Sequence, residues 1–234
     1  MTRCSVRPEQ RDVRQLHNRL PGATIFVLGN GPSVKEHDLS RLRGLHVIGM
    51  NASPLLDREY GFQSSYYVVS DLRFLTHPDK RVFATSKYLS PGISRVFRDE
   101  LRSVDVQEQI PFTYYVKTIG KNGFSTNLAQ GFYFGCTTSL LAIQLASHLG
   151  CSRVVLLGND FRYPKNQPRF YQESSPQGHD QFLSIQLWNI RNAYRVLRAR
   201  NVELCICSRN TNLVPYLPYV TFDEVVERAR QENE

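Results

Sequence analysis

Cysteine is scarce in this chain of 234 residues, and it follows no pattern. The five cysteines form no C-x-x-C pair and have no histidines at the spacing of a zinc site. An odd number of cysteines also argues against a disulfide framework. We therefore expect free thiols packed in the core of a protein from a reducing compartment, and we predict no metal ligands.

Long apolar runs and blocks of charge are also missing. The longest mostly apolar stretch, residues 132–149, contains Thr137, Gln144 and His148 and is too mixed to span a bilayer alone. The Arg-rich N-terminus lacks the apolar segment of a secretory signal. No run of five basic residues and no nucleic-acid module is present. These absences predict a cytoplasmic protein with no nucleic-acid partner. The net charge of +8 favours anionic ligands and leaves contact with a membrane surface open.

The most informative stretch present is an apolar run that breaks into Gly29-Asn30-Gly31-Pro32-Ser33. This pattern is typical of a buried strand that ends in a tight turn before a helix. The two glycines are able to adopt positive φ and to let an anion approach the main chain, while Ser33 offers a hydroxyl donor. The turn therefore predicts a phosphate cradle, although strand–glycine–helix turns are often only tight connections.

Strands and helices alternate along the chain, which predicts an α/β fold with a mostly parallel, Rossmann-like sheet and helices on both faces. We expect one domain over residues 1–234, with a lid at about 162–180 because that stretch is long and without period. Strands are predicted at 25–28, 46–50, 66–69, 81–84, 113–116, 154–157 and 202–207, and helices at 7–20, 35–42, 140–149, 181–200 and 222–231.

Polar residues follow several of these strands directly. Because the carboxyl ends of parallel strands meet at one edge of a sheet, we expect these side chains to converge on one crevice. A cluster of hydroxyls, Thr137, Thr138 and Ser139, begins the helix after residue 135 and suits a phosphate or carboxylate. The residues at the strand ends are Asn30, Asn51, Ser70, Asp71 and Asp160.

The motifs, in this order, resemble those of the bacterial sialyltransferases of glycosyltransferase family 42. The resemblance runs over about residues 25–217. Two of its blocks, the first motif and residues 135–161, also resemble the related MptE-like family, which includes archaeal pterin pyrophosphokinases and flagellin-modifying Maf proteins. The segments that carry it are 29–36 with Asp38 and 40–42, the Thr/Ser turn before 140–150, 158–161, Gly178-His179 and 203–208.

The resemblance implies a GT-A-like single-domain transferase. Such an enzyme moves a nonulosonic acid, either sialic acid or a Kdo-like sugar, from a CMP-activated donor to a glycan or glycolipid in lipopolysaccharide or capsule biosynthesis. It implies no metal and no other cofactor, a lid over the donor, and a tetramer. An enzyme of this kind works in the cytoplasm, with membrane association left open.

The resemblance also implies roles for individual residues. Asn30, Asn51, Ser70, Thr138, Ser139 and Asp160 fall where the family binds the nucleotide sugar, and His179 falls on the proposed general base of the lid. A histidine suits this role because it titrates near neutral pH. The departing phosphate needs hydrogen-bond donors, for which the lid offers Tyr163 and Tyr171, with Arg162 as a charge.

The sequence departs from the family in two places and leaves alternatives open. It has Gly135 where family 42 carries an arginine and Pro176 where it carries a lid tyrosine, so another CMP-linked keto sugar is a candidate donor. Asp71 is closer to the MptE-like set, where a carboxylate would suit Mg²⁺ and ATP in a pyrophosphokinase. A nucleotide-binding module without activity is the third hypothesis. Asp180 is better explained as a helix cap than as a catalytic group.

Overall fold

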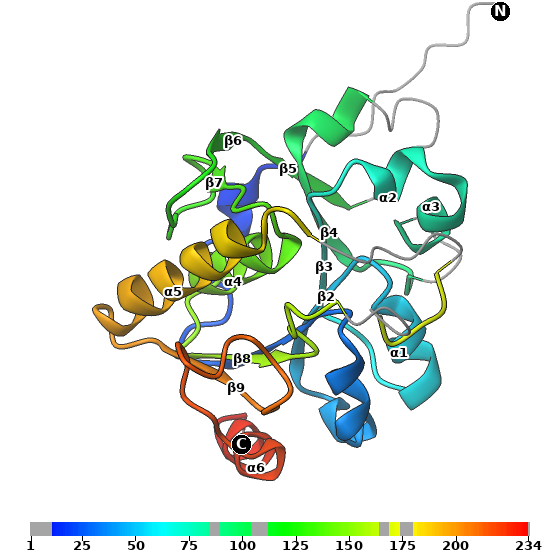
Figure 1. The fold of residues 1–234 in the computed structure, drawn as a ribbon. Coiled ribbons are helices and arrows are strands. Elements are labelled where there is room, and N and C mark those ends of the chain that lie inside the picture. The colour runs from blue at the N-terminus through cyan, green and yellow to red at the C-terminus, as the bar shows by residue number, and fades with distance from the viewer. Residues whose placement is uncertain (1–10, 85–88, 104–111, 164–168, 174–179, 234) are drawn as a thin grey trace, which may run out of the picture.

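A seven-stranded sheet forms the centre of the computed structural model, which describes residues 11–84, 89–103, 112–163, 169–173 and 180–233 (Figure 1). Its strand order is β5-β4-β3-β2-β1-β8-β9, and every pairing is parallel. The strands are β1 (Thr24–Leu28), β2 (His46–Met50), β3 (Tyr66–Val69), β4 (Ser94–Arg98), β5 (Thr113–Val116), β8 (Arg153–Leu157) and β9 (Glu203–Ile206). The predicted α/β architecture is confirmed.

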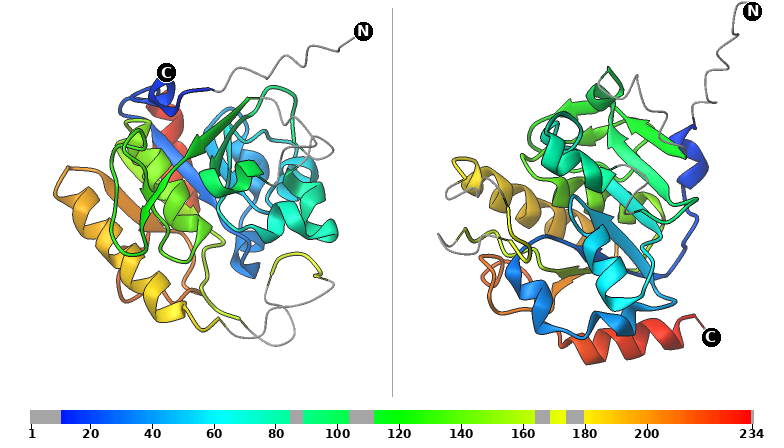
Figure 2. Two further views of the ribbon diagram at one scale, coloured as in Figure 1. Left: turned by 90° about the horizontal axis from the view of Figure 1, so that it is seen from above. Right: turned by 90° about the vertical axis from the view of Figure 1, so that its right-hand side faces the viewer.

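Helices cover both faces of this sheet, as the two views of Figure 2 show. One face carries the 3-10 helix η1 (Val13–Leu16) with α4 (Thr138–His148) and α5 (Leu183–Arg198). A small parallel pair, β6 (Thr118–Gly120) and β7 (Phe132–Tyr133), lies beside α4. The other face carries α1 (Pro54–Tyr60), α2 (Arg73–Thr76), α3 (Pro78–Ala84), α6 (Phe222–Gln231) and the 3-10 helices η2 (Pro32–Glu36), η3 (Leu39–Leu42) and η4 (Asp99–Ser103).

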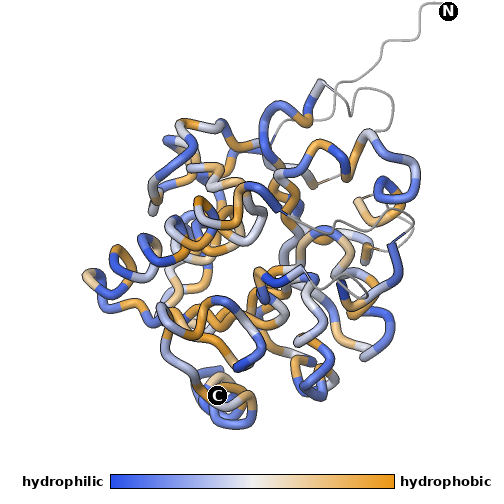
Figure 3. The backbone as a smooth tube through the Cα atoms, viewed as in Figure 1, coloured by the Kyte–Doolittle hydropathy of each residue, from blue (hydrophilic) through white to orange (hydrophobic). Residues whose placement is uncertain are grey.

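The strands are hydrophobic along their length because both of their faces are covered. In β1, Ile25 and Val27 join the core under α4, whereas Phe26 and Leu28 join the core on the opposite face. All four side chains are fully buried. Figure 3 shows the central strands in orange and the outer helices in bands of blue and orange, the pattern of elements with one buried side.

Three predicted elements differ from the structure. Residues 81–84 form the end of helix α3 and not a strand, because Pro78 starts a helix that the β-branched and aromatic pattern of 81–84 obscured. Strand β4 was not predicted, and it occupies the place in the sheet beside β3. Residues 35–42 are parts of two 3-10 helices, and η1 is the only helical turn in the described part of 7–20. Within the described residues, no helix combines the length and hydropathy of a membrane span.

Candidate active site

A cavity of about 650 Å³ opens at the carboxyl ends of β1, β2, β3 and β8. The chain runs outward from β1 to β5 and then returns to β8 on the other side of β1, so the order of strands reverses at this point. In parallel sheets the turns on either side of such a reversal diverge and leave a crevice, which is where these folds bind ligands. The topology therefore puts the cavity where a ligand is expected.

Most of the described residues that the sequence predicted for the site lie around this one cavity. They come from the ends of four strands, the start of α4 and the segment after β8, which are far apart in the sequence. His179 lies outside the described residues. The predicted residues that line the cavity are Asn30, Gly31, Asn51, Ser70, Asp71, Thr137, Thr138, Ser139, Asp160, Arg162 and Tyr163.

Asn30 joins the turn after β1 to the turn after β2. Its amide nitrogen donates to the carbonyl of Met50 at 3.0 Å, and its amide oxygen accepts from the backbone of Ala52 at 2.9 Å. The side chain is buried, so these two bonds satisfy backbone groups that have no access to water. Asn30 thus fixes the shape of the rim, and only its remaining hydrogen-bonding capacity faces a ligand.

The glycine turn does not have the conformation expected of a phosphate cradle. Gly31 has φ of −73°, and Gly29 is also outside the positive-φ region. These glycines are needed for a different reason: a Cβ at position 29 would overlap the carbonyl of Gly158, and one at position 31 would overlap the carboxyl group of Asp160. The turn is packed against the end of β8.

Asp160, which follows β8, is hydrogen-bonded to the segment that follows β1. Its carboxylate accepts hydrogen bonds from the backbone N–H of Ser33, at 3.0 Å, and from the Ser33 hydroxyl. Burial raises the pKa of Asp160, although the bonds from Ser33 act in the opposite direction. The predicted role of Ser33 as a donor to a phosphate finds no support here, because its hydroxyl donates to Asp160 and the residue does not line the cavity.

The start of α4 presents hydroxyl groups to the cavity. Thr137 caps the helix by accepting from the backbone of Ser139. The Thr138 hydroxyl lies 2.9 Å from that of Ser70 at the end of β3, and the Ser139 hydroxyl donates to the side chain of Asn159 at 2.6 Å. The positive end of an eleven-residue helix and a pair of hydroxyls therefore meet at one wall, which suits an anion.

Asn51, after β2, is the polar group at the rim that is least satisfied by the protein. Its side-chain oxygen is buried and finds no hydrogen-bond partner among the described residues. Its backbone has φ of 53°, a region that asparagine tolerates better than most residues. Cys136 and Phe161 also have positive φ and also line the cavity. Strained backbone and an unpaired amide at one cavity are typical of a ligand site.

Arginines line the side of the cavity formed by β3 and β4. Arg73 binds Asp71 through both its side chain and its backbone, with the shortest contact at 2.6 Å. Burial acts to raise the pKa of Asp71, but the bonds with Arg73 outweigh it and the pKa is lowered. Arg98, at the end of β4, pairs with Glu100, and its guanidinium lies 4.8 Å from the ring centre of Phe134. The lining also includes Arg162 and Arg169.

Gln186 of α5 links segments around the opening of the cavity through hydrogen bonds. Its amide nitrogen donates to the carbonyl of Cys136 at 2.9 Å and to Asp180 at 2.8 Å. The hydroxyl of Tyr163 lies 3.3 Å from the same Asp180 oxygen. Burial raises the pKa of Tyr163, so its phenol keeps its proton and acts as a donor. Asp180 also accepts from the backbone of Phe182 in the turn before α5, but the N-cap residue of the helix is Phe182 and not Asp180.

Tyr171 does not belong to the site. Its ring packs against Phe83 and Phe170, and its hydroxyl donates to Glu173 at 3.2 Å. It does not line the cavity. The aromatic residues around it in the predicted lid made it a candidate in the sequence, but its ring is partly buried by apolar packing that includes Phe83 of α3.

Several lining residues were missed by the sequence reasoning. Arg98 was missed together with strand β4, although an arginine at the end of an apolar strand is a pattern of the same kind as Asn30 and Asn51. Asn159 was not singled out, although it follows β8 in the same Gly-Asn pattern in which Asn30 follows β1. Gln186 carries no local pattern that distinguishes it from other amides. Among the described residues, no group of three His, Cys, Asp or Glu side chains has the arrangement of a metal site.

Comparisons with known proteins identify the fold. The sialyltransferase CstII of Campylobacter jejuni, solved with cytidine-5'-monophosphate, matches with a TM-score of 0.55 and 14% identity over 85% of each chain. The monofunctional α-2,3-sialyltransferase Cst-I of the same organism matches with a TM-score of 0.50 and 14% identity, over 85% of this chain and 80% of that one. The MAf glycosyltransferase of Magnetospirillum magneticum AMB-1 matches with a TM-score of 0.51 and 13% identity, over 94% of this chain and 40% of that one.

No protein-family model matches the chain, and no curated protein matches it. At identities of 13–14% the likeness of these structures establishes a shared fold. The two groups of proteins that the sequence motifs resemble are the two groups that the structure matches. The resemblance is therefore confirmed in three dimensions.

Proposed function

We propose that this protein is a glycosyltransferase that transfers a nonulosonic acid from a CMP-activated donor to a glycan. The observation that carries the proposal is the pair of hydroxyls from Ser70, after β3, and Thr138, at the start of α4, in the same cavity as the unpaired amide oxygen of Asn51. The fold supports it, because structures of CstII hold CMP and, in one case, a trisaccharide acceptor with CMP. The donor class is inferred from these neighbours.

The chemistry asks little of a metal ion. The acceptor oxygen bonds to the anomeric carbon of the sugar, the bond from that carbon to the phosphate oxygen breaks, and CMP leaves with the electron pair. Hydroxyls at a helix N-terminus and the Tyr163 phenol are suited to stabilise the departing phosphate. We therefore propose a reaction that needs no metal.

We propose that Arg98 takes the place of the arginine that family 42 carries at the position of Gly135. The chain has Gly135 where the family carries an arginine, yet the Arg98 guanidinium lies against Phe134, the neighbour of Gly135. We propose that this guanidinium, which also pairs with Glu100 through Nε and Nη2, binds the phosphate or the carboxylate of a keto-acid sugar. His179 is proposed as the base that accepts the proton of the acceptor hydroxyl.

The first test is nucleotide binding followed by thermal unfolding, because a ligand that binds only the folded state raises its melting temperature. CMP is expected to raise it with or without EDTA, while UDP, AMP and ATP have less effect. A shift with ATP and Mg²⁺ but none with CMP would favour the pyrophosphokinase alternative and overturn the proposal.

The second test uses matched hydroxyl variants on one strand. Ser70 follows the last residue of β3 and lines the cavity. Ser65 precedes the first residue of β3, at the amino end of the strand, away from the cavity. Ser70→Ala is expected to weaken CMP binding by about tenfold, the effect of one hydrogen bond to a charged group, and Ser65→Ala to leave it unchanged. His179→Ala should suppress hydrolysis of CMP-sialic acid or CMP-Kdo without changing CMP affinity. If His179→Ala hydrolysed the donor as fast as the wild type does, the imidazole of His179 would not be the base.

A further inference from the structure

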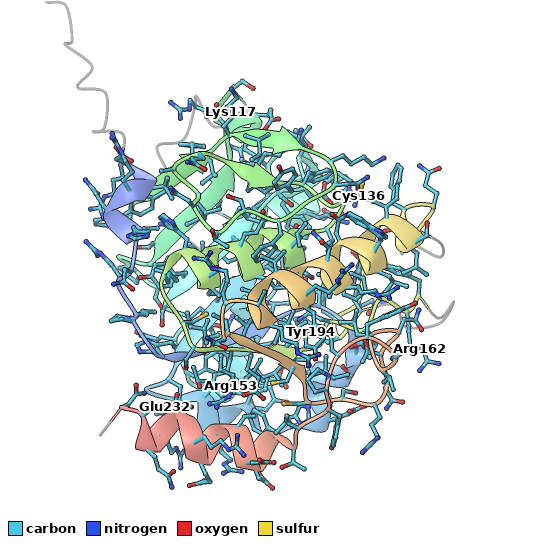
Figure 4. The ribbon with its side chains drawn as sticks, turned by 90° about the vertical axis from the view of Figure 1, so that its left-hand side faces the viewer. Lys117, Cys136, Arg153, Arg162, Tyr194 and Glu232 are labelled. Carbon is cyan, nitrogen blue, oxygen red and sulfur yellow. The ribbon has the colours of Figure 1, made fainter. Side chains whose placement is uncertain are left out.

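The exposed face of α5 is a basic stripe with one large aromatic residue. Figure 4 faces this helix, with Tyr194 near its middle and Cys136 near its N-terminal end. Five exposed positions are spaced alternately by four and three residues, which confines them to an arc of about 80° on a helix of 3.6 residues per turn. These positions are Ser184, Trp188, Arg191, Arg195 and Arg198.

Trp188 is the sole tryptophan of the chain and is 53% exposed, more than any other large apolar side chain in the described residues. The opposite side of α5 is buried through Ile190, Ala193 and Leu197. The helix is therefore held firmly by its apolar side, and nothing in its packing requires a tryptophan on the outside. An indole exposed among arginines matches the residues that proteins place at a membrane–water interface.

Acidic residues are absent from α5 and from much of its surroundings. Residues 181–202 contain four arginines and no Asp or Glu, so this stretch alone contributes four of the net eight positive charges. Residues 112–159 and 204–222, which include α4 and the loop after β9, also contain no Asp or Glu. Because no carboxylates are interspersed, the charge of this face is not cancelled locally and attracts an anionic surface.

A second copy of the chain fits this stripe less well. The acidic residues of α6 that would complement it already have basic partners: Asp223 and Glu227 pair with Arg41, and Glu224 pairs with Arg228. Glu232 pairs with Arg153, as the neighbouring labels in Figure 4 illustrate. Docking of α5 on α6 would have to break these pairs.

We infer that the exposed stripe of α5 docks on an anionic phospholipid surface, with Trp188 entering the headgroup region and the arginines contacting lipid phosphates. The α5 helix starts at the rim of the cavity, where Phe182 is 39% exposed and lies under Lys121. A membrane that binds this stripe would therefore lie beside the opening of the cavity. The inference does not depend on the proposed reaction.

Trp188 makes the test direct, because all tryptophan fluorescence of the protein reports this position. The full chain is titrated with vesicles of phosphatidylcholine alone or with added phosphatidylglycerol. The emission is expected to shift to shorter wavelength only with the anionic vesicles and to return at 0.5 M NaCl. No shift with anionic vesicles, or the same shift with both types, would overturn the inference.

Charge-reversal variants provide the control. Arg191→Glu with Arg195→Glu is expected to weaken vesicle binding at least tenfold, since each basic residue near such a surface contributes a several-fold factor. Arg19→Glu with Arg58→Glu changes the net charge equally at exposed positions outside the stripe and should have a much smaller effect. Equal effects of the two pairs would overturn the inference. The inference would also be overturned if the wild type formed an oligomer that Arg191→Glu with Arg195→Glu dissociates. The same holds if a soluble polyanion shifted the emission of Trp188 as the vesicles do.

Discussion

The two sides of the cavity differ in how far the protein itself uses their polar groups. On the side of β1 and β8, the polar side chains are bonded within the protein: Ser33 bonds to Asp160, and Asn159 bonds to the backbone of β1 and β8. Asn30 bonds to the backbone at the end of β2. On the side of β2, β3 and β4, Asn51 keeps an unpaired amide oxygen, and arginines face the cavity. The comparison shows that polar residues at strand ends serve two purposes. One side builds the rim, and the other is available to a ligand.

The largest effect is expected from Gly31→Ala on the rim-building side. The new methyl group would overlap the Asp160 carboxyl group and push the two strand ends apart. We expect a loss of about 1–3 kcal/mol in the free energy of unfolding, measured by urea denaturation. Asp160→Ala in the same chain removes the overlap, so the double variant should be more stable than the sum of the single effects predicts. If the changes in the free energy of unfolding were simply additive, the contact between positions 31 and 160 would be contradicted.

A pair of asparagine variants separates the two sides. Asn30→Ala leaves the carbonyl of Met50 and the N–H of Ala52 without partners and should cost about 1–3 kcal/mol of stability. Asn51→Gly keeps the positive φ and removes an unpaired oxygen, so stability should change by less than about 0.5 kcal/mol. CMP affinity should nevertheless fall about tenfold in Asn51→Gly, because the proposed hydrogen bond between Asn51 and the ligand would be lost. Calorimetry of CMP binding checks this, and unchanged affinity would place Asn51 with the rim-building residues.

Gln186 and Asn189 test whether the contacts of α5 with the rim matter for binding. Gln186→Glu puts a second carboxylate beside Asp180, so CMP affinity should fall several-fold at pH 8 and recover as the pH is lowered and the introduced carboxylate takes up a proton. Asn189 is a buried amide one turn later that binds Asn122 and Gly123, away from the cavity. Asn189→Asp should lower stability without such pH-dependent binding. The same pH profile in both variants would rule out a specific role for Gln186.

The smallest effect concerns the pH dependence of stability. Because the pKa of Asp160 is raised in the folded protein, its carboxyl favours folding when protonated, and this contribution is lost as the pH rises through that pKa. The lowered pKa of Asp71 has the opposite result: its contribution is present above the unfolded pKa of 3.8 and is lost as the pH falls. Between pH 3 and 7 the stability of the wild type relative to Asp160→Asn should fall, and relative to Asp71→Asn it should rise. Parallel denaturation profiles would contradict these assignments.

Local pattern was enough to find the strand ends. Asn30, Asn51 and Ser70 each follow an apolar run, and such runs become parallel strands whose carboxyl ends share an edge. The same reasoning failed for Arg98, because residues 81–84 have a strand-like pattern and were taken for the strand beside β3. It also failed for Tyr171, since nothing in the predicted lid, which is rich in aromatic residues, distinguishes a ring that faces a ligand from one packed on α3.

The sequence by itself determined the fold and the edge of the sheet that carries the site, because strand and helix periods and the residues that follow them are local properties. Tertiary structure decided which polar groups are used up in holding the rim and which remain for a ligand. That division depends on contacts such as Ser33 with Asp160, which are 127 residues apart, and Gln186 with Cys136, which are 50 apart. A hydrogen bond requires atoms about 3 Å apart, and spacing along the chain does not determine such a distance.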